Sequence, residues 1–251
     1  MFTLTGKVAI VTGASQGMGA EHARTFVELG ARVAVADVRR EEGTALAKEL
    51  GANAEFFDLD VTNPDHWADV VARVAEKWSP ATVLVNNAGI PGPVVHTASL
   101  AVADYLRTIA VDQHGVFFGM RAVIPGMLES GGGSIVNIAS VAGFAHVRHV
   151  PNAAYTAAKF AVRGLTRAAA MEYGEQGVRV NCVLPGPVLT PMLARGSATD
   201  AAMQAVGDSV VLKRCAQPRE VSNLVAFLAS DAASYVTGSD HFVDGGQAAG
   251  W

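Results

Sequence analysis

Cysteine is scarce in this sequence of 251 residues, which contains only Cys182 and Cys215. A lone pair in a chain of this size does not make a disulfide framework, and it indicates free thiols in a reducing compartment. The sequence also lacks any run of about 18 apolar residues that could span a bilayer. Met1 is followed almost at once by a predicted strand, which leaves no room for a signal peptide. We therefore expect a soluble, cytoplasmic protein with no membrane segment.

Basic residues are also few, because 19 Lys and Arg stand against 23 Asp and Glu and give a formal net charge of -4. Since no Lys/Arg cluster offsets this balance, we expect no binding to nucleic acid. No set of histidines and acids has metal-ligand spacing, so no metal site is predicted. Apolar residues, in contrast, make up 50% of the chain, and no linker or repeat divides it. This composition predicts a single domain over residues 1–251.

Helical and strand patterns alternate along the chain, which favours an α/β fold. The first predicted strand, Lys7–Thr12, is almost continuously apolar and β-branched, as in a parallel strand buried on both faces. A loop of sequence Thr-Gly-Ala-Ser-Gln-Gly-Met-Gly (residues 12–19) then leads into a helix. Glycines there let the backbone approach a pyrophosphate, which lies at the positive end of the helix. The predicted dinucleotide contacts are Gly13, Ser15, Gln16, Gly17, Met18 and Gly19.

A second predicted strand, Arg32–Ala36, is followed by Asp37, eighteen residues after Gly19. In dinucleotide-binding folds an acid at about this distance binds the adenosine ribose hydroxyls, and its charge repels a 2′-phosphate. Asp37, with Val38 beside it, therefore predicts NAD rather than NADP. The alternative is that Asp37 only caps the following helix.

Two more loops follow predicted strands, at 54–59 and 82–85, and so fall on the ligand-binding edge of a parallel sheet. In the first loop, Asp60 can accept a hydrogen bond from an adenine amino group, with Val61 next to it. The second loop, Asn-Asn-Ala-Gly at 86–89, suits a turn where backbone approaches a flat ligand, although such residues also mark ordinary turns. We assign Asn87, Ala88 and Gly89 to the cofactor site.

Tyr155 and Lys159 are four residues apart on a predicted helix from about 153 to 173, so both side chains can lie on one face. A free tyrosine has a pKa of about 10, and an adjacent ammonium group in a dry site lowers it. Ser140, fifteen residues before Tyr155, would then bind the oxygen whose proton is exchanged. Alone, the pair could arise by chance with a solvated lysine, so the remaining motifs decide its interpretation.

Three further segments flank these residues. A long helix is predicted over about 102–128 and carries Asp112. The loop between Ser140 and Tyr155 contains His146, Arg148 and His149, which could bind a polar substrate group or simply lie on the surface. After a predicted strand at 178–184, Pro185-Gly186 interrupts regular structure beside the ligand edge. Residues from about 190 to 213 then form a long excursion of the kind that often covers a site as a lid.

Over essentially its whole length the chain resembles the short-chain dehydrogenase/reductase family. The matching motifs are the glycine loop at 12–19, Asn-Asn-Ala-Gly at 86–89, Ser140, Tyr155-x-x-x-Lys159, Asn181 with Pro185-Gly186, and Asp244-Gly245-Gly246. The resemblance implies a seven-stranded parallel, doubly wound sheet with helices on both faces, and a homotetramer.

By the same resemblance, Ser140 orients the substrate oxygen and Tyr155 is the catalytic acid and base. Lys159 binds the nicotinamide ribose and lowers the tyrosine pKa. The nicotinamide half of the cofactor is expected to contact Asn87, Val188 and Thr190, and Pro185, Gly186, Tyr155 and Lys159 are further expected cofactor contacts.

Two features depart from the family pattern. Asp112 stands where the family has an asparagine, whose main-chain carbonyl holds a water linked to the lysine. We therefore include Asp112 among the catalytic candidates, with a role that depends on its charge. The interval between Ser140 and Tyr155 is also slightly longer than usual, which bears on substrate shape.

We therefore predict an NAD-dependent oxidoreductase that interconverts a secondary alcohol and a ketone. In oxidation, Tyr155 as phenolate takes the hydroxyl proton while hydride passes to the nicotinamide. An apolar, alicyclic or hydroxysteroid-like substrate is favoured by apolar lid residues, which could also simply pack the lid: Met192, Leu193, Met203, Val206, Val210 and Leu212. Two alternatives are a 3-oxoacyl-type ketoreductase, which Asp37 disfavours, and a dinucleotide-sensing binding protein without turnover.

Overall fold

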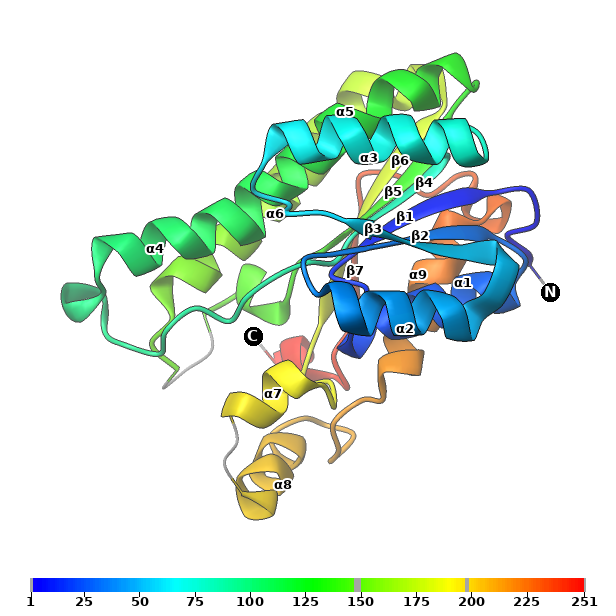
Figure 1. The fold of residues 1–251 in the computed structure, drawn as a ribbon. Coiled ribbons are helices and arrows are strands. Elements are labelled where there is room, and N and C mark those ends of the chain that lie inside the picture. The colour runs from blue at the N-terminus through cyan, green and yellow to red at the C-terminus, as the bar shows by residue number, and fades with distance from the viewer. Residues whose placement is uncertain (1, 147–149, 197–198, 251) are drawn as a thin grey trace.

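The computed structural model describes residues 2–146, 150–196 and 199–250. Seven parallel strands form one sheet in the order β3-β2-β1-β4-β5-β6-β7 (Figure 1). The strands are β1 (Val8–Thr12), β2 (Arg32–Asp37), β3 (Ala54–Asp58), β4 (Val83–Asn86), β5 (Gly133–Ile138), β6 (Val178–Pro185) and β7 (Asp240–Val243). The order reverses direction between β1 and β4, and ligands of open α/β sheets bind at such a reversal.

The part of the chain that the structure describes contains nine α-helices. They are α1 (Gly17–Glu28), α2 (Arg40–Leu50), α3 (Pro64–Lys77), α4 (Val102–Ile109), α5 (Gly115–Glu129), α6 (Ala153–Tyr173), α7 (Pro191–Gly196), α8 (Asp200–Asp208) and α9 (Pro218–Ala229). Helices α3, α5 and α6 pack on one face, and α1, α2 and α9 pack on the other (Figure 1). This is the predicted doubly wound architecture, which is confirmed.

The central strands read as apolar runs because both of their faces are covered. Every residue of β1 and of β4 is buried, whereas the edge strands β3 and β7 are only partly buried. One apolar cluster lies between the sheet and α3, α5 and α6, and a second lies beneath α1 and α9. The two clusters hold the carboxyl ends of the strands at a common edge.

The predicted long helix over 102–128 is wrong in one respect, because a π-helical turn, Ala110–His114, separates α4 from α5. A π-turn widens the backbone ring to i→i+5 bonds, and such turns occur frequently at functional sites. Asp112 lies within this turn and is fully buried. No glycine or proline marks the turn in the sequence, so the regular apolar pattern concealed it.

The sequence pattern also predicts a fifth strand from Ile135 to Ser140 and an end of regular structure at the prolines up to Pro191, and the structure differs at both places. Strand β5 ends at Ile138, so Ser140 lies beyond the strand in the following turn. Pro191 begins α7 rather than ending regular structure, because proline needs no hydrogen-bond partner in the first turn of a helix. Among the described residues, no helix is both long and apolar enough to cross a membrane.

Candidate active site

The glycine-rich loop after β1 packs directly against the turn after β4. Gly13 has φ +62°, and a Cβ there would lie 2.8 Å from the Cα of Ala88. A Cβ at Gly19 would lie 2.2 Å from the carbonyl oxygen of Gly13. Only glycine fits at both positions, because backbone atoms fill the space at each of them and, at Gly13, L side chains also disfavour the positive φ. The two loops therefore form one continuous wall at the reversal between β1 and β4.

Hydrogen bonds fix this wall. The hydroxyl Oγ1 of Thr12 accepts the backbone N–H groups of Asn87 and Ala88, at 2.9 and 3.0 Å. The Asn87 side chain donates to the carbonyl of Thr12 at 2.9 Å. Its Oδ1 atom is buried and has no hydrogen-bond partner among the described residues. A buried acceptor without a partner is costly, so this atom fits a ligand that donates a hydrogen bond.

Asp37 ends β2 next to the glycine-rich loop and is almost fully buried. One carboxylate oxygen accepts the N–H of Ser15 at 2.9 Å, and the other accepts the N–H of Arg39 at 3.0 Å. Both oxygens keep further acceptor capacity. The carboxylate is therefore held rigidly at the position predicted for ribose recognition. It also satisfies a backbone N–H just before α2, so capping and ligand binding are compatible.

The other predicted cofactor contacts lie at the same edge of the sheet. Asp60 accepts the N–H and the hydroxyl of Thr62 at 2.9 and 2.7 Å through one oxygen. Thr190 lies beside Gly17, with its side chain 3.6 Å from a Cβ placed there. Gln16 precedes α1, and Met18 lies in the first turn of that helix. Val38 is exposed, whereas Val61 and Val188 are buried. Pro185 ends β6, Gly186 follows it, and Gly89 lies near Lys159.

The predicted catalytic residues are brought together at the start of α6. The ammonium of Lys159 lies 5.4 Å from the centroid of the Tyr155 ring and donates to the carbonyl of Ile138 at 3.2 Å. Ser140 reaches Tyr155 with a hydrogen bond that lowers the tyrosine pKa. The Ser140 hydroxyl also accepts the N–H of Ala142 at 3.1 Å, which fixes its rotamer. The geometry therefore suits proton transfer at the phenol oxygen.

The pKa of Tyr155 differs from the sequence-based expectation in its net direction. Burial raises the pKa of this phenol above its ordinary value of 10.0, and the carboxylate of Asp112 adds to the rise. Lys159 and the Ser140 hydrogen bond oppose both effects, as predicted, but do not overcome burial in the protein alone. Lys159 therefore acts in the expected direction without making the phenol acidic by itself.

Asp112 lies directly against Lys159. Its Oδ2 atom is 3.4 Å from the lysine Nζ, and both side chains are buried. Its Oδ1 atom accepts the N–H of Ile90 at 2.8 Å. Burial raises the pKa of Asp112, although Lys159 opposes that rise. Burial lowers the pKa of Lys159, but Asp112 and Tyr155 outweigh this effect, so the net direction for the lysine is upward. The carboxylate is thus part of the same charged cluster as the tyrosine.

Two groups of supporting residues were not predicted. Arg163, one turn after Lys159 on α6, donates to the carbonyl of Gly143 at 2.7 Å and to the carboxylate of Asp240 at 2.7 and 2.9 Å. It therefore ties the turn after Ser140 to β7. Its position four residues beyond Lys159 was the only available signal, because its partners come from distant segments.

A buried polar network holds α6 to the sheet. Asn86 donates to the side-chain oxygen of Asn137 at 2.9 Å, and Asn137 donates to the hydroxyl of Thr166 at 3.0 Å. All three side chains are buried. Buried amides satisfied in this way specify one arrangement of their elements, so the network fixes the helix that carries Tyr155 relative to β4 and β5.

The loop before α6 contributes less than the sequence suggested. His146 shares a hydrogen bond with the hydroxyl of Thr156 at 3.0 Å, whereas Arg148 and His149 lie outside the described residues. Within the described ranges, no group of three His, Cys, Asp or Glu side chains could hold a metal ion.

The chain is similar to known proteins along nearly its whole length. A family profile described as Enoyl-(Acyl carrier protein) reductase matches residues 13–248. A 3-alpha-(or 20-beta)-hydroxysteroid dehydrogenase of Mycobacterium tuberculosis is 46% identical over 247 residues, covering 98% of this chain and 91% of that protein. A trans-4-hydroxycyclohexanecarboxylate dehydrogenase of Sinomonas cyclohexanicum is 41% identical over 255 residues, covering 97% and 93%.

A similar solved structure is assigned to an NAD(P)-dependent gluconate 5-dehydrogenase of Beutenbergia cavernae and has NADP bound at low occupancy. Its TM-score is 0.92 at 35% identity, with 99% of each chain covered. Profile, relatives and structure all span nearly the whole chain and include the loops at the β1–β4 reversal and the α6 helix. The chain therefore belongs to the short-chain dehydrogenase/reductase family and is a dinucleotide-dependent oxidoreductase acting on CH–OH groups.

Proposed function

We propose that this protein uses NAD to interconvert a secondary alcohol and a ketone, with Tyr155 as the acid and base. The observation that carries the proposal is the packing of the Lys159 ammonium 5.4 Å from the Tyr155 ring centroid. The Ser140 hydroxyl acts on the same phenol by lowering its pKa. Two features support a cofactor surface at the carboxyl edge of the sheet: the Asn87 oxygen that has no partner among the described residues, and the bare backbone at Gly13.

The residues of this chain would act as follows. Ser140 donates a hydrogen bond to the substrate oxygen and holds it near the Tyr155 phenol. In oxidation the phenolate takes the hydroxyl proton, and in reduction the phenol returns it. Lys159 stabilises the phenolate by its charge. A bound nicotinamide cofactor supplies the chemistry of accepting or donating the hydride.

We propose NAD rather than NADP because of the charges around Asp37. The Arg39 guanidinium is paired with Glu42 at 2.9 Å, and the Arg40 guanidinium is paired with Asp58 at 2.6 Å. These basic groups near the ribose position therefore already have carboxylate partners, while Asp37 would repel a 2′-phosphate. The similar gluconate dehydrogenase structure holds NADP, so kcat/KM measured with NAD and with NADP is the test of this preference.

We propose an apolar, alicyclic substrate under a lid formed by residues 190–213. The excursion begins and ends at one bridge, where Leu189 donates to the Ala216 carbonyl and Ala216 donates to the Pro187 carbonyl, each at 2.9 Å. Met192 and Leu212 are exposed on it, at 38% and 62%, whereas Val210 is buried and packs near Gly245. Two relatives named for hydroxysteroid and hydroxycyclohexanecarboxylate substrates support the same substrate class.

The experiment is to follow NADH formation with a panel of steroidal, alicyclic and linear secondary alcohols. We expect turnover with the alicyclic members and much lower kcat/KM with short linear ones. A 3-oxoacyl-type ketoreductase would instead prefer acyl thioesters with NADPH. A dinucleotide-sensing protein would bind NADH and turn over none of the compounds, and that result would contradict the proposal.

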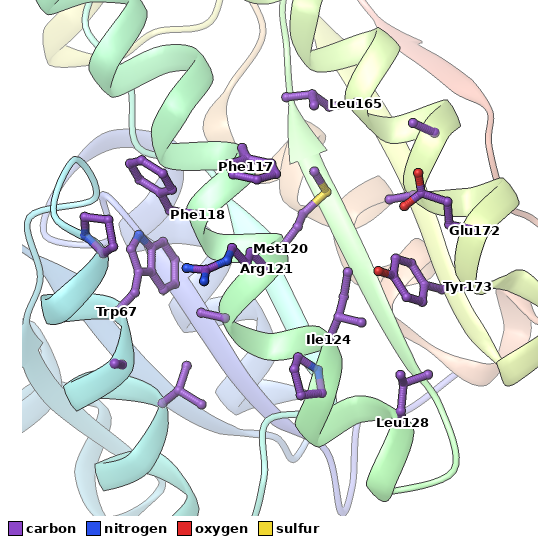
Figure 2. A pocket seen from close by; sticks show the side chains of 17 residues that line it. Trp67, Phe117, Phe118, Met120, Arg121, Ile124, Leu128, Leu165, Glu172 and Tyr173 are labelled. Carbon is purple, nitrogen blue, oxygen red and sulfur yellow. The ribbon is translucent and has the colours of Figure 1, made fainter.

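We further propose a homotetramer in the cytoplasm. A groove of about 760 Å³ opens between α3, α5 and α6 (Figure 2), and Phe117 and Leu128 on it are 45% and 37% exposed. Small residues are exposed along α6, with Ala168 in the groove and Ala157 and Gly164 nearer the start of the helix, which permits close approach of another helix. Both cysteines are free and buried, which supports a reducing compartment.

A further inference from the structure

The contacts of Asp112 are those of an ionised carboxylate. Oδ1 accepts an N–H from Ile90 at 2.8 Å, and Oδ2 lies 3.4 Å from the Lys159 ammonium. Oδ2 makes no hydrogen bond within the described part of the chain, so a proton on it would have no acceptor there. Burial raises the pKa of this carboxyl, whereas Lys159 and the Ile90 N–H act in the opposite direction. Because a carboxylate facing one donor and one cation is stabilised as the anion, we treat the two residues as an ion pair.

This pair changes the charge of the catalytic centre. The titratable groups facing it are Tyr155 and Lys159 on α6 and Cys182 on β6. Burial raises the pKa of Cys182 to about 12, so that thiol adds no charge near neutrality. With Tyr155 protonated, the cluster is neutral with the carboxylate present and would carry one positive charge without it.

The charge of the cofactor differs between its two redox forms, because the oxidised nicotinamide ring is a cation and the reduced ring is neutral. Gly89 separates the ion pair from the open edge, since a Cβ there would lie 3.3 Å from the Asp112 carboxylate and 3.4 Å from the Lys159 ammonium. Charges so close to the cofactor wall, and buried from solvent, act with little screening.

We propose that Asp112 is a positioning residue that balances the charge of Lys159 and so makes the site prefer the oxidised cofactor over the reduced one. The proposal rests on the proposed function, because it places the nicotinamide beside Lys159. With a carboxylate at position 112 in place of asparagine, the site would bind the oxidised cofactor, the form needed for alcohol oxidation, more favourably relative to the reduced one.

The test is the dissociation constant of NAD⁺ and of NADH for wild type and Asp112→Asn, measured by calorimetry and by NADH fluorescence from about pH 6 to about pH 9. The matched control is Asp104→Asn, which removes the same charge from an exposed position on α4. We expect Asp112→Asn to raise the ratio Kd(NAD⁺)/Kd(NADH) by roughly three- to tenfold, with no change in the control. Asp112→Ser, which is small and neutral, replaces the asparagine variant if that variant does not fold.

An unchanged ratio at every pH, or equal weakening of both cofactor forms, would overturn the proposal, since a merely structural role affects both forms alike. The binding measurement needs no turnover. Wild type that binds both forms but oxidises no alcohol would contradict the proposed function, while the ratio would still decide the role of Asp112. Should NADP be the cofactor instead, the same ratio is measured with NADP⁺ and NADPH.

Discussion

At the scale of single residues, the proposed chemistry depends on the Tyr155 phenol, whose neighbours shift its pKa in opposite directions. Burial and Asp112 raise the pKa of Tyr155, while Lys159 and the Ser140 hydrogen bond lower it. Because the phenol must exchange a proton, the balance among these neighbours decides the pH range in which it works. The residues whose replacement tests this balance and the cofactor preference are Tyr155, Asp112 and Asp37.

Replacing Tyr155 with phenylalanine removes the proton-transferring oxygen and keeps the ring against Lys159. We expect kcat for alcohol oxidation to fall by at least about 100-fold, whereas the affinity for NADH, measured by fluorescence, stays close to that of wild type. Retention of substantial turnover would show that another group carries the proton.

The Asp112→Asn variant is expected to remain active, with the pH profile of kcat/KM for oxidation shifted toward lower pH. The reason is that the carboxylate raises the pKa of Tyr155, so its removal lets the phenolate form at lower pH. We expect a shift of roughly half to one pH unit. A loss of activity as large as that of Tyr155→Phe would mean that the carboxylate itself carries protons.

The cofactor preference is expected to depend on Asp37. Wild type should show a kcat/KM for NAD at least about tenfold above that for NADP, because the carboxylate repels a 2′-phosphate. The double variant Asp37→Ser/Val38→Arg should narrow that gap, since Val38 is 63% exposed beside the site. Asp65→Ser, an exposed acid on α3, serves as the control. Equal wild-type values for the two cofactors would remove the assignment of Asp37.

At the scale of elements, α1 carries the glycine-rich loop and packs against α9 through a buried histidine. The His22 ring shares a 2.7 Å hydrogen bond between Nδ1 and the Ser222 hydroxyl, which itself donates to the Pro218 carbonyl. The other ring nitrogen, Nε2, is buried without a partner among the described residues. Burial lowers the pKa of His22 to about 3, so the folded protein keeps this ring neutral.

This histidine predicts a defined loss of stability in acid. Unfolding raises its pKa to about 6.5, so the unfolded chain binds the extra proton first, and stability is lost as pH falls from about 6.5 toward about 3. The slope contributed by this group approaches roughly 1.4 kcal/mol per pH unit. His22→Asn keeps a donor for Ser222 and removes the titration. We expect urea unfolding of this variant to depend less on pH across that window, and an identical pH dependence would exclude His22 as the cause.

At the scale of the whole molecule, the groove between α3, α5 and α6 is the surface that the proposed tetramer would cover. The groove shown in Figure 2 is lined mostly by apolar side chains, including Phe117, Leu128, Leu165 and Ala168. An exposed apolar surface of this kind is typical of an interface. The groove is lined partly by α6, the helix that carries Tyr155, so the proposed interface and the proposed catalytic residue would share that helix.

We expect wild type to be a tetramer by light scattering at micromolar concentration and Ala168→Glu to give smaller species. A buried unpaired carboxylate would disfavour the association. The control is Thr44→Glu, an exposed position on α2 across the sheet, which should leave the tetramer intact. A monomeric wild type would refute the expected oligomeric state.

The sequence by itself determined the framework of this protein. The apolar runs at β1 and β4, the glycines at 13 and 19, and the four-residue spacing of Tyr155 and Lys159 are local patterns whose geometry follows from backbone rules. Such patterns predicted the parallel sheet, which is confirmed, and they support the proposals that the glycine-rich loop binds a dinucleotide and that α6 carries the acid and base. They do so because one element defines each of them.

Only the tertiary structure decided what these groups experience. The π-turn at Ala110–His114 turns Asp112 onto Lys159, and the resulting ion pair joins residues 47 positions apart. Arg163 binds Asp240 across 77 positions of the chain, and His22 shares a hydrogen bond with Ser222 across 200. Burial and charge pairing depend on which distant segments pack together, and the sequence pattern of one segment contains no record of its partner. The strands and loops could therefore be predicted from patterns within single segments, whereas the electrostatics of the site depend on how distant segments pack.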